Sequence, residues 1–105
     1  MRVVIKKVGQ EPEIREINGE LHEMQNIVGG WIECFNVVNN IVCVCDEEGK
    51  LKNYQPNFFF NGDVIVGDVF FCVAGEEDFE SLNDEDAKFV SDLVKIMCAK
   101  GLDFM

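Results

Sequence analysis

The chain has 105 residues, 48% of them hydrophobic, and its 20 acidic and 9 basic residues give a net charge of −11. This length predicts one domain, residues 1–105, with a core large enough to fold without disulfides or a bound metal. The charge disfavours direct binding to the phosphates of DNA or RNA. Because no apolar run approaches the roughly 20 residues of a membrane span and no signal peptide is recognisable, we expect a cytoplasmic protein that does not engage membranes.

The N-terminal third predicts a β-hairpin and then a short helix. Residues 2–8 have the composition of a strand, residues 9–12 form a turn, and residues 13–17 form an edge strand with its isoleucines loosely inward. Leu21, Met24 and Ile27 or Val28 then recur at helical spacing. Asn18 is the predicted N-cap of this helix, and Gly29–Gly30 is the predicted stop.

The middle of the chain predicts a second hairpin. Residues 31–38 and 41–45 are rich in β-branched and apolar residues, and Asn39–Asn40 between them suits a two-residue turn. The unbroken run IVCVC at 41–45 indicates a central strand that is covered on both faces. We expect Trp31 in the core, with stacking on a ligand in a pocket as the alternative.

The stretch CDEEGKLKNYQPN, residues 45–57, predicts an acidic turn followed by an ordered loop. It is not an EF-hand, because the sixth and twelfth positions counted from Asp46 are Leu51 and Asn57 instead of glycine and a carboxylate. Its lysines are unusual on so acidic a chain. They lie close in sequence to an aromatic residue and an amide, and we interpret the group as a partner-binding site: Lys50, Lys52, Tyr54 and Asn57, with Phe59 as an apolar anchor.

Three adjacent phenylalanines, Phe58–Phe60, cannot all face inward along one strand. We expect two of them in the core and one covering a neighbouring loop; the alternative is an exposed anchor for a partner or for self-association. Asn61–Gly62 is a turn signal. Residues 63–73 then predict one long strand, in which Gly67 marks a bulge or a close backbone approach.

The C-terminal segment predicts the longer helix, capped by Asn83 at its start and by Gly101 at its end. Three carboxylates in its first turn complement the helix dipole. With the acids just before them they form the most negative predicted surface: Glu76, Glu77, Asp78, Glu80, Asp84, Glu85 and Asp86. The expected fold class is therefore α+β, a mainly antiparallel sheet of about five strands with one short helix and one longer C-terminal helix.

Five cysteines, an odd number, lie mostly in apolar runs, and this pattern predicts reduced, buried thiols that pack as small hydrophobic residues. A zinc site would need a second half-site beside the closest pair, Cys43 and Cys45, and His22 is the only histidine. We expect no metal and no cofactor.

Four stretches occur in a fixed order along the chain: IVGGWIE, CDEEGKLKNYQPN, NGDVIVGDVFF and DFESLNDED. This succession resembles a family of small bacterial and phage proteins classed as a domain of unknown function, over about residues 1–90. The chain departs from the family pattern at Cys45–Asp46 and at Asn83, where either replacement still serves a turn or a cap. The resemblance implies no established activity, but it implies a context of phages, plasmids and conjugative elements.

Catalysis is not expected, because no nucleophile motif or phosphate-binding glycine loop is present and a single histidine offers little acid–base capacity near neutral pH. The composition favours a non-catalytic protein-interaction module of mobile-element or phage origin, with another protein or a second copy of the chain as its partner. A sharper version is an inhibitor of a nucleic-acid-binding host defence system, in which the acids stand in for phosphates. The alternative is a small-ligand, nucleotide-like binding protein. It is favoured if Arg2, Lys6, Lys50 or Lys52 are gathered in one pocket, and disfavoured if the surface is acidic throughout.

Overall fold

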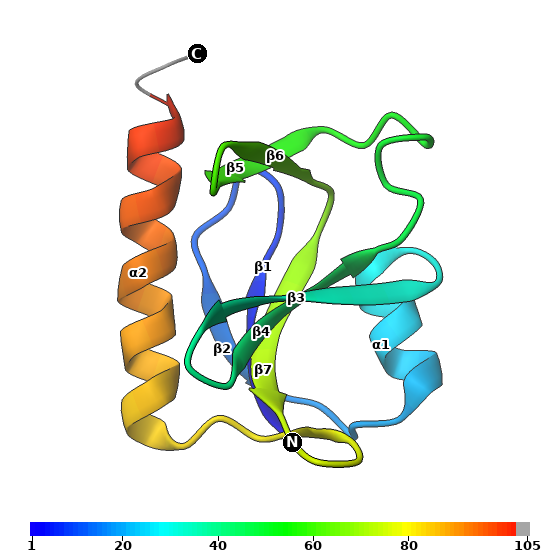
Figure 1. Cartoon of the computed structure of the whole chain (residues 1–105), viewed down its shortest axis with the longest axis vertical. Coiled ribbons are helices and arrows are strands. Elements are labelled where there is room, and N and C mark those ends of the chain that lie inside the picture. The colour runs from blue at the N-terminus through cyan, green and yellow to red at the C-terminus, as the bar shows by residue number, and fades with distance from the viewer. Residues whose placement is uncertain (103–105) are drawn as a thin grey trace.

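The computed structural model describes the backbone of residues 1–102 and the side chains of residues 1–98. Its main feature is an antiparallel sheet in which five strands follow the order β2-β1-β7-β4-β3, and a short sixth strand, β8, pairs with β7. Two helices cover the sheet, and Figure 1 shows them on opposite sides of it. The expected α+β class, with a longer C-terminal helix, is confirmed.

The elements occur in one order along the chain, and their bounds are as follows: β1 Arg2–Lys6, β2 Glu13–Glu16, α1 Leu21–Val28, β3 Ile32–Val38, β4 Ile41–Asp46, β5 Pro56–Phe60, β6 Asp63–Val66, β7 Val69–Ala74, β8 Phe79–Glu80 and α2 Asp84–Leu102. Strands β5 and β6 form a separate two-stranded sheet.

The central strands bury both of their faces because their side chains alternate between two apolar clusters. On one face, Cys43 and Phe71 pack with residues of α2 and β5. On the other face, Val44 and Phe70 pack with residues of α1. Every residue of β4 is buried, which confirms the expectation from the run IVCVC.

Two-residue turns close two of the hairpins. In the β3–β4 hairpin Val38 pairs with Ile41, so Asn39–Asn40 forms the turn as predicted, and Asn39 adopts a φ of 52°. In the β5–β6 hairpin Phe60 pairs with Asp63 around Asn61–Gly62, both of which have positive φ. This is the backbone conformation that such turns require.

The predicted strand over residues 63–73 is wrong. Strand β6 ends at Val66 and β7 begins at Val69, and the two belong to different sheets. Gly67, with a φ of +78°, turns the chain between them. The apolar pattern continues on both sides of this glycine, so the sequence alone did not separate a bulge from a change of sheet.

Of the helix ends predicted from the sequence, two are confirmed and two are wrong. Asn83 caps α2, since its side-chain oxygen accepts the backbone N–H of Asp86 at 2.7 Å. Gly29 ends α1 in the left-handed region as expected. The Asn18 cap is wrong, because α1 begins at Leu21 and the Asn18 side chain accepts the N–H of Glu20 before the helix starts. The Gly101 cap is also wrong, because α2 continues to Leu102.

The edge strand β2 packs less of its surface than expected. Every residue of β2 is exposed, including Ile14, whereas Ile17 just after the strand is buried among residues of α1 and the sheet. Ile14 therefore does not face the core. It lies on a strand that has only one neighbour, β1, and both β2 residues beside it carry charge.

The cysteines are free thiols, and Cys43, Cys45 and Cys72 are buried as expected, whereas Cys34 is exposed. The phenylalanine run also divides between environments. Phe58 is buried, with its ring centre 6.1 Å from that of Phe71, and Phe60 is half-buried with its ring 5.4 Å from that of Phe35.

Candidate functional site

The end of β4 carries a carboxylate, Asp46, whose side chain is 1% exposed. One of its oxygens accepts hydrogen bonds from Lys52 Nζ at 2.7 Å and from the Tyr54 hydroxyl at 2.9 Å. Its other oxygen accepts the backbone N–H of Glu48 at 2.8 Å. We call the side chains of Asp46, Lys52 and Tyr54 the buried-carboxylate cluster. It ties the loop after β4 to the end of the strand that precedes the loop.

Three glycines approach this cluster so closely that a Cβ atom on any of them would force a neighbouring atom to move. A Cβ atom on Gly67 would lie 2.5 Å from the Tyr54 ring, and one on Gly29 would lie 2.5 Å from the Tyr54 hydroxyl. A Cβ atom on Gly30 would lie 2.5 Å from Lys52 Nζ. The segments after α1, after β4 and after β6 therefore meet here, and they belong to three of the stretches that carry the family resemblance.

The hydrogen bonds set the charges within the buried-carboxylate cluster. Burial by itself would raise the pKa of Asp46, but the hydrogen bonds from Lys52, the Glu48 backbone and Tyr54, together with the Lys52 charge, outweigh burial and lower that pKa. The hydrogen bond to Asp46 raises the pKa of Lys52 and that of Tyr54. At neutral pH the cluster is therefore a carboxylate, an ammonium and a neutral phenol.

The predicted partner-binding residues are spread over several local environments. Lys52 and Tyr54 are brought together, but Lys50 pairs with Asp63 at 2.6 Å, on the β6 side of the loop. Asn57 lies against Lys6. Phe59 is half-buried beside the β1–β2 turn. Their role in binding a partner stays a prediction, and the structure gives four of them a role inside the protein.

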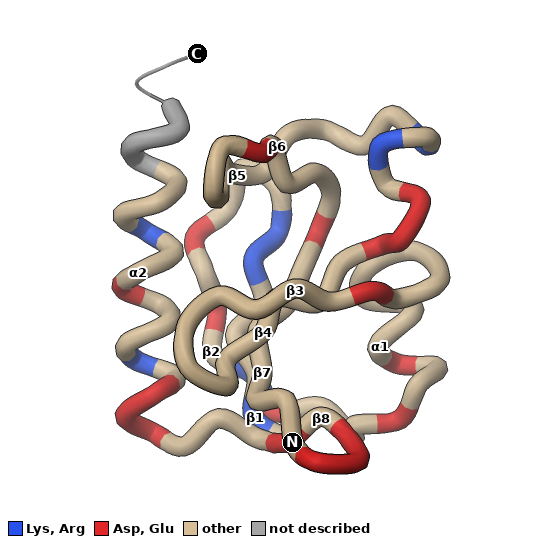
Figure 2. Tube along the Cα trace, viewed as in Figure 1, with Lys and Arg blue, Asp and Glu red and all other residues tan. Residues whose placement is uncertain are grey.

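The seven acids that the sequence predicted as the most negative surface lie together at one end of the molecule (Figure 2). Figure 2 shows two red segments there, the loop that leads into β8 and the first turn of α2. Asp84 forms an ion pair with Arg2. Within the part of the chain that the structure describes, the other acids at this end form no ion pair with a basic side chain: Glu76, Glu77, Asp78, Glu80, Glu85 and Asp86.

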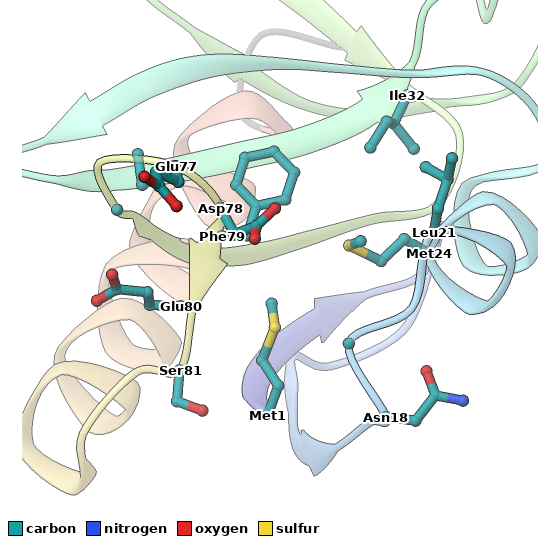
Figure 3. A pocket seen from close by; sticks show the side chains of 13 residues that line it. Met1, Asn18, Leu21, Met24, Ile32, Glu77, Asp78, Phe79, Glu80 and Ser81 are labelled. Atoms are coloured by element: carbon teal, nitrogen blue, oxygen red, sulfur yellow. The ribbon is translucent and has the colours of Figure 1, made fainter.

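A pocket of about 790 Å³ opens beside the β7–β8 loop. Figure 3 shows Met1, Met24 and Phe79 around one space, with the loop acids on one side of it and Asn18 on the other. Leu21 and Ile32 add to its apolar lining. We call it the acid-rimmed pocket, because Glu77, Asp78 and Glu80 are exposed at its edge.

The sequence predicted the acids at the edge of this pocket but not its apolar floor. Met24 lies on the predicted apolar stripe of α1 and is buried in the cluster under this helix, and Ile32, within the predicted strand 31–38, packs against the same cluster; the sequence did not indicate that both also line a pocket. The feature that could have indicated this apolar floor is the short length of α1. A helix of eight residues covers only part of one sheet face, which leaves apolar side chains beside it accessible.

Trp31 is not in the core, contrary to expectation: it is 65% exposed. It immediately precedes the edge strand β3, where Ile32 turns toward the cluster under α1. Trp31 therefore falls on the other face, with Glu33, which is also exposed. The α2-side core reaches Phe35 further along β3 but not Trp31.

The four cations that a nucleotide-like ligand would need are not gathered in one pocket. Arg2 pairs with Glu16 and Asp84 near the acidic end. Lys50 pairs with Asp63, the first residue of β6, and Lys52 pairs with Asp46, the last residue of β4. Lys6 lines the pocket between the β1–β2 turn, β5 and α2, and the other three cations are not among the residues that line it. The ligand-binding alternative therefore gains no support from a site shared by these cations, and it stays a prediction.

Within residues 1–98, no group of three or more histidine, cysteine, aspartate or glutamate side chains is arranged to hold a metal ion. None of the helices found in residues 1–102 is both long enough and apolar enough to cross a membrane.

Comparison with known proteins places the chain in a family. A family model described as Domain of unknown function (DUF3846) matches residues 1–95. The chain belongs to this family. The resemblance stated from the sequence is confirmed at the level of an uncharacterised small domain family, and the match covers all elements up to the middle of α2. No curated protein and no solved structure matches the chain.

Proposed function

We propose that this member of the family is a non-catalytic protein-interaction module, and that its acid-rimmed pocket receives a basic segment of a partner protein. One observation carries the proposal. The exposed carboxylates of Glu77, Asp78 and Glu80, which no described cation neutralises, stand at the edge of an accessible apolar pocket. Such a pairing of charge and apolar surface complements a segment that has both basic and apolar side chains.

The two parts of this surface have different physical effects. The carboxylates, on a protein with a net charge of −11, attract a basic partner and raise the association rate. The apolar floor, which includes Met24 and Phe79, supplies burial that slows dissociation. A second copy of the chain presents the same charges at this end. Self-association through this pocket would therefore be opposed by repulsion, and the predicted homodimer would need another surface.

The chemistry of the rim also favours one kind of partner. Basic clefts that bind nucleic acids are lined by lysine and arginine side chains, which contact phosphates. A row of carboxylates can occupy the same positions. The finer form of the proposal is therefore that the partner is a nucleic-acid-binding protein of a host defence system, which this protein inhibits on behalf of a phage or mobile element.

The test compares two variants with the same change in charge. The first carries Glu77→Gln, Asp78→Asn and Glu80→Gln at the pocket. The matched control carries Glu47→Gln, Glu48→Gln and Asp92→Asn, which are exposed acids outside the pocket. Each protein is immobilised and exposed to host lysate at low and high salt, and retained proteins are identified by mass spectrometry.

The expected result is a basic protein that is retained at low salt by the wild type and by the control, and lost from the pocket variant. The purified partner should then bind the pocket variant more weakly and with a smaller dependence on salt. Equal loss from both variants would indicate attraction by net charge alone and would contradict a role for the pocket. Retention of no protein at either salt would contradict the interaction proposal itself.

A further inference from the structure

A buried lysine that pairs with no carboxylate among residues 1–98 lies far from the acid-rimmed pocket. Lys6, the last residue of β1, is 3% exposed. Because side chains alternate along a strand, Lys6 shares the sheet face of Val4, which belongs to the cluster covered by α2 and β5. In Figure 1 this end of the molecule, with the β5–β6 sheet, lies opposite the end that carries the N-terminus and the acidic loop.

The hydrogen bonds of Lys6 leave it incompletely neutralised. Its Nζ donates to the backbone oxygen of Lys7 at 2.6 Å and to the side-chain oxygen of Asn57 at 2.9 Å. The Asn57 amide nitrogen donates to the backbone oxygens of Lys6 and Gly67, and these contacts fix the amide oxygen toward the ammonium. Both acceptors are neutral. Among the described residues, no carboxylate oxygen lies within 4.0 Å of Lys6 Nζ.

A buried charge of this kind is costly unless an opposite charge accompanies it. An ammonium also has three N–H donors, and the protein provides acceptors for two of those of Lys6. An oxyanion placed beside Nζ would neutralise the charge and accept the third hydrogen bond. Lys6 thus has the donor and the charge of an anion-binding group that the described side chains do not satisfy.

Space for such a ligand lies next to the lysine. A pocket of about 560 Å³ is lined by Lys6 and Asn57, by the β1–β2 turn, by β5 and by α2. Its walls are largely apolar, with Phe58, Phe59 and Val64 among them. This volume lies within the roughly 300–1,000 Å³ that is usual for small-molecule sites. We call it the Lys6 pocket.

The charges around the Lys6 pocket favour an anion. Lys95 on α2 adds a second cation to its lining, and Glu11 is the one acid among the residues that line it. Burial raises the pKa of the Cys98 thiol in this pocket; the charge of Lys6 acts against that rise, and the charge of Glu11 adds to it. On a chain with a net charge of −11, two cations facing one apolar cavity are a local exception.

We infer that the Lys6 pocket binds a small organic anion, one with a single carboxylate or phosphate head at Lys6 and an apolar body against Phe58 and Phe59. Lys95 strengthens the attraction from the side of α2. This site is independent of the proposed function, because the two pockets share no lining residue. It is also narrower than the nucleotide-like site expected from the sequence, since it uses Lys6 without Arg2, Lys50 or Lys52.

The test uses a charged probe and its neutral isostere. The ¹⁵N-labelled protein is titrated with 3-phenylpropionate and, separately, with 3-phenylpropanamide, and amide chemical shifts are followed by NMR. The expected result is that the carboxylate shifts signals of residues 6–11 and 55–59 in a saturable way and that the amide binds at least about tenfold more weakly, as the loss of a charge-assisted contact implies. Titration with phenyl phosphate shows which of the two heads is preferred.

Variants assign the effect to the pocket. Lys6→Met should weaken 3-phenylpropionate binding about tenfold or more, whereas Lys88→Met, an exposed position on the same helix as Lys95, makes the same charge change and should leave it unaltered. Lys95→Met, at an exposed position, provides a second test if Lys6→Met does not fold, and it should weaken binding severalfold. Equal binding of acid and amide, shifts that map elsewhere, or no shift with either anion would overturn the inference.

Discussion

The hydroxyl of Tyr54 lies 2.9 Å from a carboxylate oxygen of Asp46, a residue buried at the end of the central strand β4. Gly29 and Gly67 pack on the same tyrosine. The stretch CDEEGKLKNYQPN is therefore not a free surface loop. It folds back on a buried charge and on two neighbouring turns, so this part of the sequence is accounted for by structure before any partner is invoked.

Tyr54→Phe should lower the free energy of unfolding by about 1–3 kcal/mol, because it removes a hydrogen bond to a buried ionised group while keeping the ring. Urea denaturation followed by circular dichroism measures the change. Lys50→Met is the control: it breaks the exposed pair with Asp63 and should change stability by less than about 1 kcal/mol. Equal effects of the two substitutions would contradict a special role for the buried carboxylate.

The buried carboxylate should also give stability a defined dependence on pH. The pKa of Asp46 is lowered from its ordinary value of 3.8 in the folded protein, so its ionised form stabilises the fold above 3.8, and this stabilisation is lost as pH falls below that value. The stability difference between wild type and Asp46→Asn, measured by urea denaturation, should therefore be full at neutral pH and shrink in acid below 3.8. Asp92→Asn, at an exposed position on α2, controls for the loss of one charge. A difference that stays constant down to the lowest pH would show that Asp46 contributes no linked proton.

Two glycines have the same backbone φ but different surroundings, so substituting each by alanine distinguishes the cost of a left-handed backbone from the cost of steric crowding. Gly62 and Gly67 both have a φ of +78°, but a Cβ on Gly62 meets nothing within 4 Å, whereas one on Gly67 would lie 2.5 Å from the Tyr54 ring. Gly62→Ala should cost about 1–2 kcal/mol, the penalty of a left-handed alanine. Gly67→Ala should cost clearly more, measured by thermal or urea unfolding. Equal costs would mean that Tyr54 moves aside freely.

Thiol reactivity should follow burial. Burial, the leading cause, raises the pKa of Cys45 and that of Cys72 to about 12, and it also raises the pKa of Cys43. Since the thiolate is the reactive form, these three should stay unmodified in native protein while the exposed Cys34 reacts first with a thiol reagent. Mass spectrometry of timed samples locates each modification, and a Cys34→Ser variant should lack the fast phase. Fast modification of Cys43 or Cys72 would contradict the burial of the central strands.

Local signals in the sequence predicted what depends on local chemistry. Asn39–Asn40 marked a hairpin and Asn83 marked the start of α2, because a turn or a cap is determined by the residues that form it. Of the two roles predicted for Gly67, the close backbone approach is confirmed by its contact with Tyr54, but the change of sheet at this glycine was not predicted, because it depends on distant partners. The same holds for the site. Closeness in sequence grouped Lys50, Lys52 and Asn57, whereas their contacts are with Asp63, Asp46 and Lys6.

The strand order has a consequence for how the chain must assemble. On one side of β7 lies the β1–β2 hairpin, and on the other lies the β3–β4 hairpin, and each can form from neighbouring residues. Only β7, at Val69–Ala74, joins them. During synthesis the five-stranded sheet therefore cannot be completed until residues 69–74 are available, because the edges of β1 and β4 that pair with β7 have no other partner in this sheet among the described strands. Completion of the sheet thus depends on one late segment of the chain, and strand edges left unpaired before that segment arrives are the feature that favours mispairing.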